Sequence, residues 1–191
     1  MPGTVTLNTR KIVILGSRSV GKSSLVKQFV ENSFSEDYYP TINTTTTKTI
    51  TYRGADYPCE IIDTAGEDEF SQLNSHYAIG VHGYILVYSI ASRASFDMIQ
   101  IIYDKIINYS GLPEIAAIIV GSKADLHLSR QVDSMAGQRL AQRNNTAWIE
   151  ASALRNENVG KVFELCLAEI EKGNTAPPPS TGFKWPKCLV M

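Results

Sequence analysis

The sequence predicts an α/β fold of three layers, helices, sheet and helices, around a mostly parallel six-stranded sheet with one antiparallel edge strand. Almost continuously apolar runs, Tyr84–Ile90 and Ile115–Val120, alternate with segments whose apolar residues recur every three or four positions. Such alternation is typical of right-handed βαβ crossovers between helix layers. The Thr-rich segment Asn43–Arg53 precedes Gly54 and predicts a hairpin that supplies the antiparallel edge strand.

The first half of the chain is expected to hold three strands and a helix. The apolar run Arg10–Leu15 predicts a buried strand, and Gly21–Asn32 has helical spacing. Asn43–Arg53 and Tyr57–Ile62 are the arms of the hairpin, and the second arm stops at a loop over 63–66.

The second half of the chain alternates strands and helices. Isoleucine and aromatic residues between the two apolar runs predict a helix that begins after Ser92 and ends at Gly111. The remaining elements are a weaker helix over 132–144, a short strand over 146–150 and a last helix from Val159 to Lys172, ended by Gly173.

Length and composition indicate one domain with a short extension at each end. The 191 residues are 43% hydrophobic and 19% charged, and the net charge of −1 argues against a nucleic-acid partner. No apolar run approaches the roughly 18 residues of a membrane span, and no signal peptide is recognised. We expect an N-terminal extension over 1–9, a domain over 10–172 and a flexible Pro-, Gly-, Ser- and Thr-rich tail over 173–191.

A phosphate-binding loop joins the first strand to the first helix. Gly16–Ser23 matches G-x-x-x-x-G-K-[ST] in full, with a strand before it and a helix after it. The backbone N–H groups of such a loop and the positive end of the helix dipole face one concavity. We expect Lys22 to reach the β- and γ-phosphates and the Ser23 hydroxyl to bind Mg²⁺. The alternative is a glycine-rich turn with a solvated lysine.

Asp63 and Gly66 follow the third strand and complete this prediction. A carboxylate at Asp63 can hold Mg²⁺ directly or through water, and the Gly66 N–H can approach a γ-phosphate closely. Alone, Asp63 is equally compatible with a turn at the end of a strand. Together with the phosphate loop it predicts a nucleotide site of the P-loop NTPase fold.

From Lys11 to about Glu171 the sequence resembles a small GTPase of the Ras superfamily. Tyr38, Tyr39, Pro40, Thr41 and Ile42 resemble the first switch, the effector region, and residues 63–70 resemble the second switch. Residues 120–126 and 150–153 resemble the two loops that recognise the base. The resemblance implies GTP and GDP as ligands and Mg²⁺ as cofactor.

The same resemblance implies a role for each site residue. Thr41 and Gly66 sense the γ-phosphate, Phe34 packs against guanine, and Lys123 lies over the ring. Asp125 accepts two hydrogen bonds from guanine that adenine cannot supply, and the Ala153 N–H binds the guanine carbonyl. The implied metal ligands are Ser23, Thr41 and Asp63, the implied catalytic residues are Thr41, Gly66 and Glu67, and the implied nucleotide-binding residues are Arg18, Ser19, Val20, Gly21, Lys22, Ser23, Ser24, Phe34, Ser35, Tyr38, Thr41, Gly66, Ser122, Lys123, Asp125, Ser152 and Ala153.

Within the superfamily the sequence most resembles the Rheb branch. Arg18 stands where most relatives have a small residue, and residues 20–24, 83–89 and 123–127 look Rheb-like. The resemblance implies a monomer that binds a GTPase-activating protein and an effector such as a TOR-type kinase complex.

Four positions bear on how well the site works. Ser122 replaces the family's asparagine, so a bond to the base and a contact that supports the phosphate loop, each worth about 1 kcal/mol, are at risk. Glu67 replaces the glutamine that orients the attacking water. Three interpretations of Glu67 are open: a general base, a poor substitute for glutamine, or an exposed residue without a catalytic part. Arg18 either obstructs an activating protein's arginine or points outward. Tyr38 either shields the γ-phosphate or packs within the switch. We expect slow hydrolysis and a long-lived GTP-bound state.

The chain ends in a prenylation motif, Cys188-Leu189-Val190-Met191, whose terminal Met favours farnesyl addition by a prenyltransferase. The tail has no second cysteine and only two basic residues, Lys184 and Lys187, so membrane lipid should bind it weakly and reversibly. We expect exchange between the cytosol and the cytoplasmic face of membranes.

The sequence is compatible with three functions. The first is a GTP/GDP-cycling switch with slow intrinsic hydrolysis, and the second is a GTP-bound binding module that barely hydrolyses GTP. A P-loop nucleotide kinase is the third, but the chain lacks an obvious arginine-rich lid.

Overall fold

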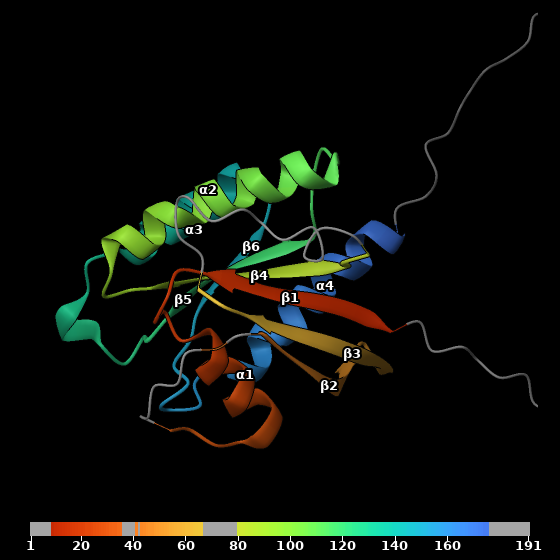
Figure 1. Cartoon of the computed structure of the whole chain (residues 1–191), viewed down its shortest axis with the longest axis horizontal. Coiled ribbons are helices and arrows are strands. Elements are labelled where there is room, and N and C mark those ends of the chain that lie inside the picture. The colour runs from red at the N-terminus through yellow and green to blue at the C-terminus, as the bar shows by residue number, and fades with distance from the viewer. Residues whose placement is uncertain (1–8, 36–40, 42, 67–79, 176–191) are drawn as a thin grey trace, which may run out of the picture.

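The computed structural model describes residues 9–35, 41, 43–66 and 80–175, and it has the predicted three-layer α/β/α architecture (Figure 1). The sheet holds six strands in the order β2-β3-β1-β4-β5-β6. The strands are β1 (Arg10–Gly16), β2 (Asn43–Tyr52), β3 (Ala55–Thr64), β4 (Gly83–Ser89), β5 (Ala117–Ser122) and β6 (Ala147–Glu150). The helices are α1 (Lys22–Glu31), α2 (Arg93–Ser110), α3 (Ser134–Arg143), α4 (Val159–Thr175) and the short 3₁₀ turn η2 (His127–Ser129).

The pairing of the strands confirms the predicted topology. Strands β3, β1, β4, β5 and β6 are parallel neighbours, and β2 pairs antiparallel with β3 at the edge. Arg53 and Gly54 form the connecting two-residue turn, and their φ values of 51° and 78° are both positive, as a type I′ turn requires. Because β2 is an edge strand, most of its threonine side chains can remain exposed to solvent.

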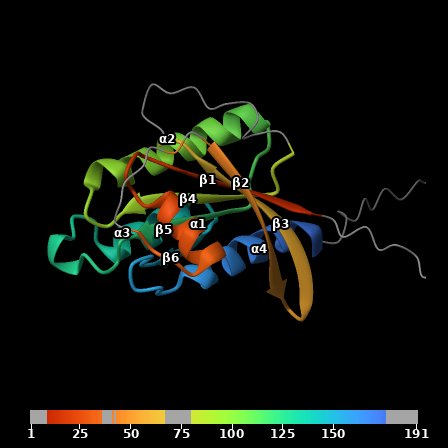
Figure 2. The same cartoon turned by 60° about the horizontal axis from the view of Figure 1, so that its bottom comes forward.

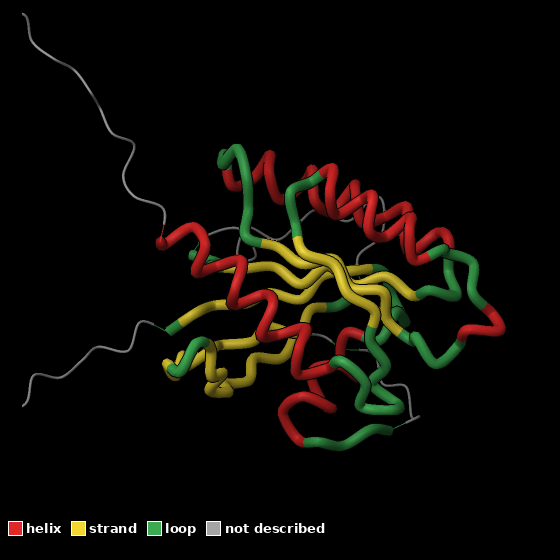
Figure 3. The backbone as a smooth tube through the Cα atoms, turned by 180° about the vertical axis from the view of Figure 1, so that it is seen from behind, coloured by secondary structure: helices red, strands yellow, loops and turns green. Residues whose placement is uncertain are grey.

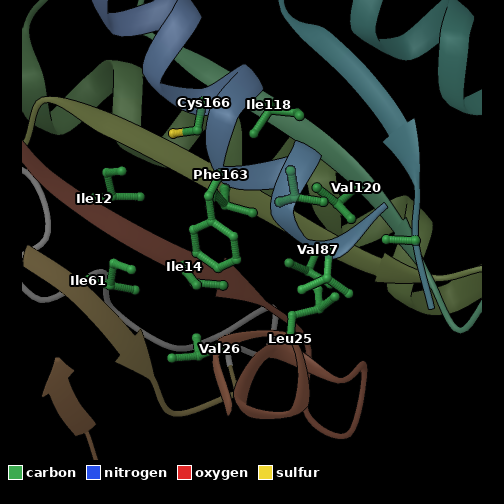
Figure 4. Packing of buried hydrophobic residues seen from close by; sticks show 14 of the residues in the cluster. Ile12, Ile14, Leu25, Val26, Ile61, Val87, Ile118, Val120, Phe163 and Cys166 are labelled. Carbon is green, nitrogen blue, oxygen red and sulfur yellow. The ribbon is translucent and has the colours of Figure 1, made fainter. Parts of the chain in front are cut away.

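The helices cover the two faces of the sheet in pairs. Helices α1 and α4 pack on one face, where Leu25, Phe163 and Cys166 meet the strands in one apolar cluster (Figures 2 and 4). Helices α2 and α3 pack on the other face, where Phe96 and Leu140 belong to a second cluster. Because β1, β4 and β5 are buried on both faces, their sequences are continuous apolar runs rather than alternating ones.

One helix has the predicted boundaries and two do not. Ser92 caps α2 by accepting from the Ser95 N–H, and Gly111 ends α2 in the left-handed region, both as expected. Helix α3 begins at Ser134 rather than Val132, because Asp133 caps it and Val132 is fully buried before it. The expected end of the last helix at Lys172 was wrong, since α4 continues through Gly173, and η2 was not predicted.

The fold separates the two ends of the sheet. The start of β1 and the end of α4 lie on the same side of the molecule, where Arg10 Nε donates to Glu171 Oε1 at 2.8 Å (Figure 3). The loops that follow β1, β3, β5 and β6 lie at the opposite edge, where parallel strands place their carboxyl ends. Among the described residues, the phosphate loop, Asp63 and the two base-recognition motifs over 120–126 and 150–153 occupy that edge.

Candidate functional site

A cavity of about 830 Å³ opens at the carboxyl ends of the strands. It is lined by residues from the loop after β1, from the segments around Phe34 and Thr41, and from the loops after β3, β5 and β6. The expected site residues that line it are Arg18, Ser19, Gly21, Lys22, Ser23, Ser24, Phe34, Ser35, Thr41, Gly66, Ser122, Lys123, Asp125 and Ala153.

Other expected residues lie behind the cavity wall. Val20 is 2% exposed and packs in the core, Ser152 is fully buried behind Asp125, and Asp63 is 3% exposed at the end of β3. Tyr38, Tyr39, Pro40, Ile42, Glu67 and Cys188 lie outside the described residues.

Five residues that line the cavity were given no role of their own by the sequence analysis. Thr64, Ala65 and Leu126 lie within the second-switch and base-recognition motifs, whereas Leu25 and Leu154 carry no motif and adjoin the phosphate loop and the second base loop. The five residues are Leu25, Thr64, Ala65, Leu126 and Leu154.

The phosphate loop is shaped by one lysine and one glycine. Lys22 is 5% exposed, and its Nζ donates to the carbonyl oxygens of Gly16 and Ser17, each at 3.0 Å. The lysine therefore ties the start of the loop to the start of α1. Gly21 stands at the N-cap with φ of 100°, a conformation that favours glycine, and it offers no side chain to cap the helix. The first N–H groups of α1 are thus left for a ligand.

The three expected metal ligands come together beside the phosphate loop. Ser23 Oγ lies 2.7 Å from Thr41 Oγ1, although the two residues belong to different segments. Burial raises the pKa of the Asp63 carboxyl, opposed by a hydrogen bond from Ser23 and by the charge of Lys22. Asp63 Oδ1 is buried and has no hydrogen-bond partner among the described residues. A buried carboxylate oxygen without a partner is costly, so this arrangement favours a bound cation.

The chemistry of these donors fits Mg²⁺. Among the described residues no three His, Cys, Asp or Glu side chains gather in a group that could hold a metal alone. One carboxylate and two hydroxyls leave room for phosphate oxygens and water, which is the mixed oxygen set that Mg²⁺ prefers beside a bound phosphate.

The far end of the cavity is formed by two connected loops. Ser152 Oγ donates to Asp125 Oδ1 at 2.5 Å, and Ser152 Oγ in turn accepts from the Arg155 N–H at 3.1 Å. The Ala124 N–H donates to the Ala151 carbonyl at 3.1 Å, which joins the loop after β5 to the loop after β6. These bonds hold the Asp125 carboxylate in place at the wall of the cavity.

Ser122 keeps one of the two contacts that its replacement of asparagine put at risk. Its side chain is 1% exposed, and its Oγ lies 2.5 Å from the Val20 carbonyl oxygen and 2.8 Å from the Tyr88 carbonyl oxygen. One hydroxyl proton serves both acceptors, so the two bonds are shared. The contact that supports the phosphate loop is therefore present, because β5 ends close enough for a serine to reach Val20. This contact, which the substitution of asparagine by serine put at risk, is retained.

Arg18 and Gly66 meet at the opening of the cavity. Arg18 is exposed and lines the cavity beside Gly66. A Cβ added to Gly66 would lie 2.3 Å from the Arg18 Cγ, so the backbone of Gly66 approaches the phosphate loop as only a glycine can.

Comparison with known proteins gives a consistent family. The family model described as "Ras family" matches residues 11–172. The chain is 53% identical to "GTP-binding protein rhb1" of Schizosaccharomyces pombe over 92% of this chain and 95% of that protein. It is 50% identical to "Small monomeric GTPase RhbA" of Aspergillus fumigatus, over 95% and 96% of the two chains. It is 46% identical to "GTP-binding protein Rheb" of Homo sapiens, over 86% and 89%.

Proposed function

The chain belongs to the Ras family, and we propose that it is a Rheb-like switch that cycles between GTP and GDP on membranes with slow intrinsic hydrolysis. Ras-family small GTPases are GTP hydrolases, so the reaction is GTP plus water to GDP plus phosphate. One observation carries the assignment of this reaction to the cavity. The phosphate loop with Lys22 and the loop with Asp125 line the same cavity. Its volume of about 830 Å³ lies within the range of small-molecule sites.

The phosphate end would hold the charged part of the nucleotide. The N–H groups at the start of α1 and the Lys22 ammonium face an anion with complementary charge. Ser23, Thr41 and Asp63 would hold Mg²⁺, which when bound neutralises charge on the phosphates. Ser23 lies against Thr41, so γ-phosphate contacts there would order the first switch.

The base end would select guanine. Ser152 fixes the Asp125 carboxylate, which then accepts from the N1–H and the amine of guanine. Adenine offers no such pair and would leave a charged acceptor without donors. Phe34 and Lys123, which line the same cavity, would cover the two sides of the ring.

Two residues, Glu67 of the second-switch motif and Arg18 at the opening of the cavity, support slow hydrolysis. Glu67 accepts but cannot donate when ionised, so it is poorly suited to orient a water molecule. Arg18 fills space beside Gly66, where an activating protein would insert its own arginine. With these residues the GTP-bound state would last longer, and the segment around Tyr38 and Thr41 would present it to an effector. By likeness to the Rheb relatives, a TOR-type kinase complex is the proposed effector.

Membrane attachment is proposed through Cys188. None of the helices within residues 9–35 and 80–175 has the length and hydropathy to cross a membrane. A farnesyl group on Cys188 would give weak, reversible attachment, because one lipid chain with little basic support is marginal. Replacing Cys188 by serine in the full chain should move the protein from the membrane pellet to the soluble fraction of expressing cells; an unchanged distribution contradicts the proposed anchor.

The direct test is the identity of the bound nucleotide. Full-length protein purified in the presence of Mg²⁺ is denatured, and the released nucleotide is separated by chromatography. GTP and GDP are expected, and recovery of adenine nucleotide contradicts the proposal. Single-turnover hydrolysis then separates a switch from a binding module, because a module would retain its GTP.

A further inference from the structure

Two segments that are distant in the sequence each contribute a wall of the cavity. Phe34 follows α1, and Ala153 and Leu154 follow β6; all three line the cavity. Phe34 is 37% exposed, so packing alone does not fix its position. A cluster of three amide side chains, Gln28, Asn32 and Asn156, connects the two walls.

The contacts of this amide cluster run between the two segments. Asn156 Nδ2 donates to Asn32 Oδ1 at 2.9 Å, across 124 positions of sequence. An amide's nitrogen and oxygen are told apart by their partners, and the Gln28 amide is satisfied with its nitrogen toward the carbonyls of Ser33 (3.1 Å) and Ala153 (3.3 Å). Its oxygen then accepts from Asn156 Nδ2 at 3.2 Å and lies 3.2 Å from Asn32 Oδ1, so the Asn156 amide is the donor that these two oxygens share.

The backbone conformation at the two asparagines suits that residue type. Asn32 and Asn156 both have φ of 52°, in the left-handed region that asparagine tolerates better than most residues. Asn32 ends α1 there, with its N–H donating to the Gln28 carbonyl. The turn of the chain at Asn32 leads directly to Ser33 and Phe34. Gln28, which bonds both Ser33 and Ala153, is 7% exposed, so water competes little for these bonds.

The opposite side of the helix end is held separately. Lys48 Nζ donates to the carbonyls of Phe29 and Val30 and lies 4.7 Å from the centre of the Phe29 ring. This contact ties α1 to β2, not to the loop after β6. The amide cluster is therefore a hydrogen-bonded link between the end of α1 and the loop after β6, in addition to the stacking of Phe29 on Phe163 of α4.

We propose that Gln28, Asn32 and Asn156 are positioning residues that hold Phe34 and Ala153 together around the base and so slow the release of nucleotide. None of the three lines the cavity, so they act through Phe34 and Ala153. The inference rests on the proposed function, because it takes the ligand of the cavity to be a guanine nucleotide.

Asn156→Asp is the sharpest variant for a test. Aspartate keeps the shape of the side chain and its tolerance of the left-handed region, but it replaces the donating Nδ2 by an oxygen that faces Asn32 Oδ1. The matched control is Asn144→Asp. Asn144 Nδ2 donates to Gln100 Oε1 at 2.9 Å, and neither residue lines the cavity.

The measurement is the release rate of fluorescent GDP, and of a fluorescent non-hydrolysable GTP analogue, from full-length protein in excess unlabelled GDP. Asn156→Asp should speed the release of both by the same factor, about fivefold, as expected for one lost hydrogen bond. The equal factor is expected because the two ligands share the base. Asn144→Asp should lower the melting temperature without changing release.

Four results would overturn or redirect the proposal. Release at the wild-type rate from Asn156→Asp, or equal acceleration in Asn144→Asp, overturns it. If Asn156→Asp does not fold, the release rate is measured instead for Gln28→Met, which removes both donations to Ser33 and Ala153. The same outcomes then apply to that variant. A wild-type protein that retains no guanine nucleotide contradicts the proposed function itself. If the wild type retains guanine nucleotide and the variants release it at the wild-type rate, only this inference is contradicted.

Discussion

Gly66 and Arg18 are in such close contact that a Cβ on Gly66 would lie 2.4 Å from the Arg18 Cα and 2.6 Å from its backbone nitrogen. These are backbone atoms of the phosphate loop, which cannot turn aside as the tip of a side chain can. The loop after β3 and the phosphate loop are therefore fitted to each other at this point, beside the expected position of the γ-phosphate.

Gly66→Ala should separate the two loops and displace the Gly66 N–H from the γ-phosphate. Affinity for a non-hydrolysable GTP analogue relative to GDP should fall by about tenfold or more, as expected for one lost hydrogen bond to a charged group. The control is Gly160→Ala, because an added Cβ there meets nothing within 4 Å. Equal affinity ratios in the two variants would show that the contact with Arg18 does not govern γ-phosphate binding.

Ser122→Ala tests the contact with the phosphate loop. The carbonyls of Val20 and Tyr88 would lose their shared donor in a buried setting, so the free energy of unfolding should fall by about 1–2 kcal/mol and GDP release should quicken. Ser110→Ala is the control, since Ser110 Oγ also donates to a backbone carbonyl, that of Ile107, at the far end of α2. Unchanged GDP release in Ser122→Ala would rule out a role in supporting the loop.

Glu67→Gln distinguishes the three interpretations of that residue by the sign of the change. If glutamate is a poor substitute for glutamine, single-turnover hydrolysis should speed up, and this is the expected result. A slower rate would identify Glu67 as a general base, and an unchanged rate would leave it without a catalytic part. Glu164→Gln, on the exposed side of α4, removes the same charge and should leave the rate unaltered.

His82 predicts a dependence of stability on pH. Its Nδ1 accepts from the Lys11 N–H at 2.9 Å, and burial, with the positive charges of Arg10 and Lys11, lowers the pKa of the imidazole despite the opposing Glu171. In the unfolded chain the imidazole has its ordinary pKa of 6.5, so it binds a proton at a higher pH than it does in the folded protein. The free energy of unfolding therefore decreases as the pH falls from about 6.5 to the lower pKa of the folded state. Denaturant unfolding at pH 7.5 and about pH 5.5 should show a smaller loss in His82→Asn, which keeps an acceptor for Lys11. Equal losses in both proteins would contradict this.

The features that the sequence predicted were those set by short-range patterns. The phosphate loop depends on glycines and a lysine at fixed spacing, and the parallel strands on apolar runs, so Gly21, Lys22 and the mostly parallel sheet with one antiparallel edge strand followed from local rules. The convergence of Ser23, Thr41 and Asp63 followed from the resemblance to a known family.

The features that the sequence did not predict depend on distances between segments far apart in the chain. A serine at position 122 gave no sign of reaching Val20, since that depends on where β5 ends beside the phosphate loop. Asn32 and Asn156, 124 positions apart, carry no recognisable motif. The continuation of α4 through Gly173 also escaped prediction, because a single glycine costs a helix only about 1 kcal/mol.

The recognition of guanine by Asp125 is tested most directly by changing the base that the site accepts. In Asp125→Asn, the amide donates to the C2 carbonyl of xanthine and accepts from its N1–H, whereas it repels the guanine amine. Displacement of a fluorescent nucleotide by GDP, xanthosine diphosphate and ADP is measured for both proteins. The wild type should prefer GDP, and the variant should prefer xanthosine diphosphate, each by about tenfold or more. A wild type that binds ADP as well as GDP, or a variant that still prefers GDP, would contradict guanine recognition by Asp125.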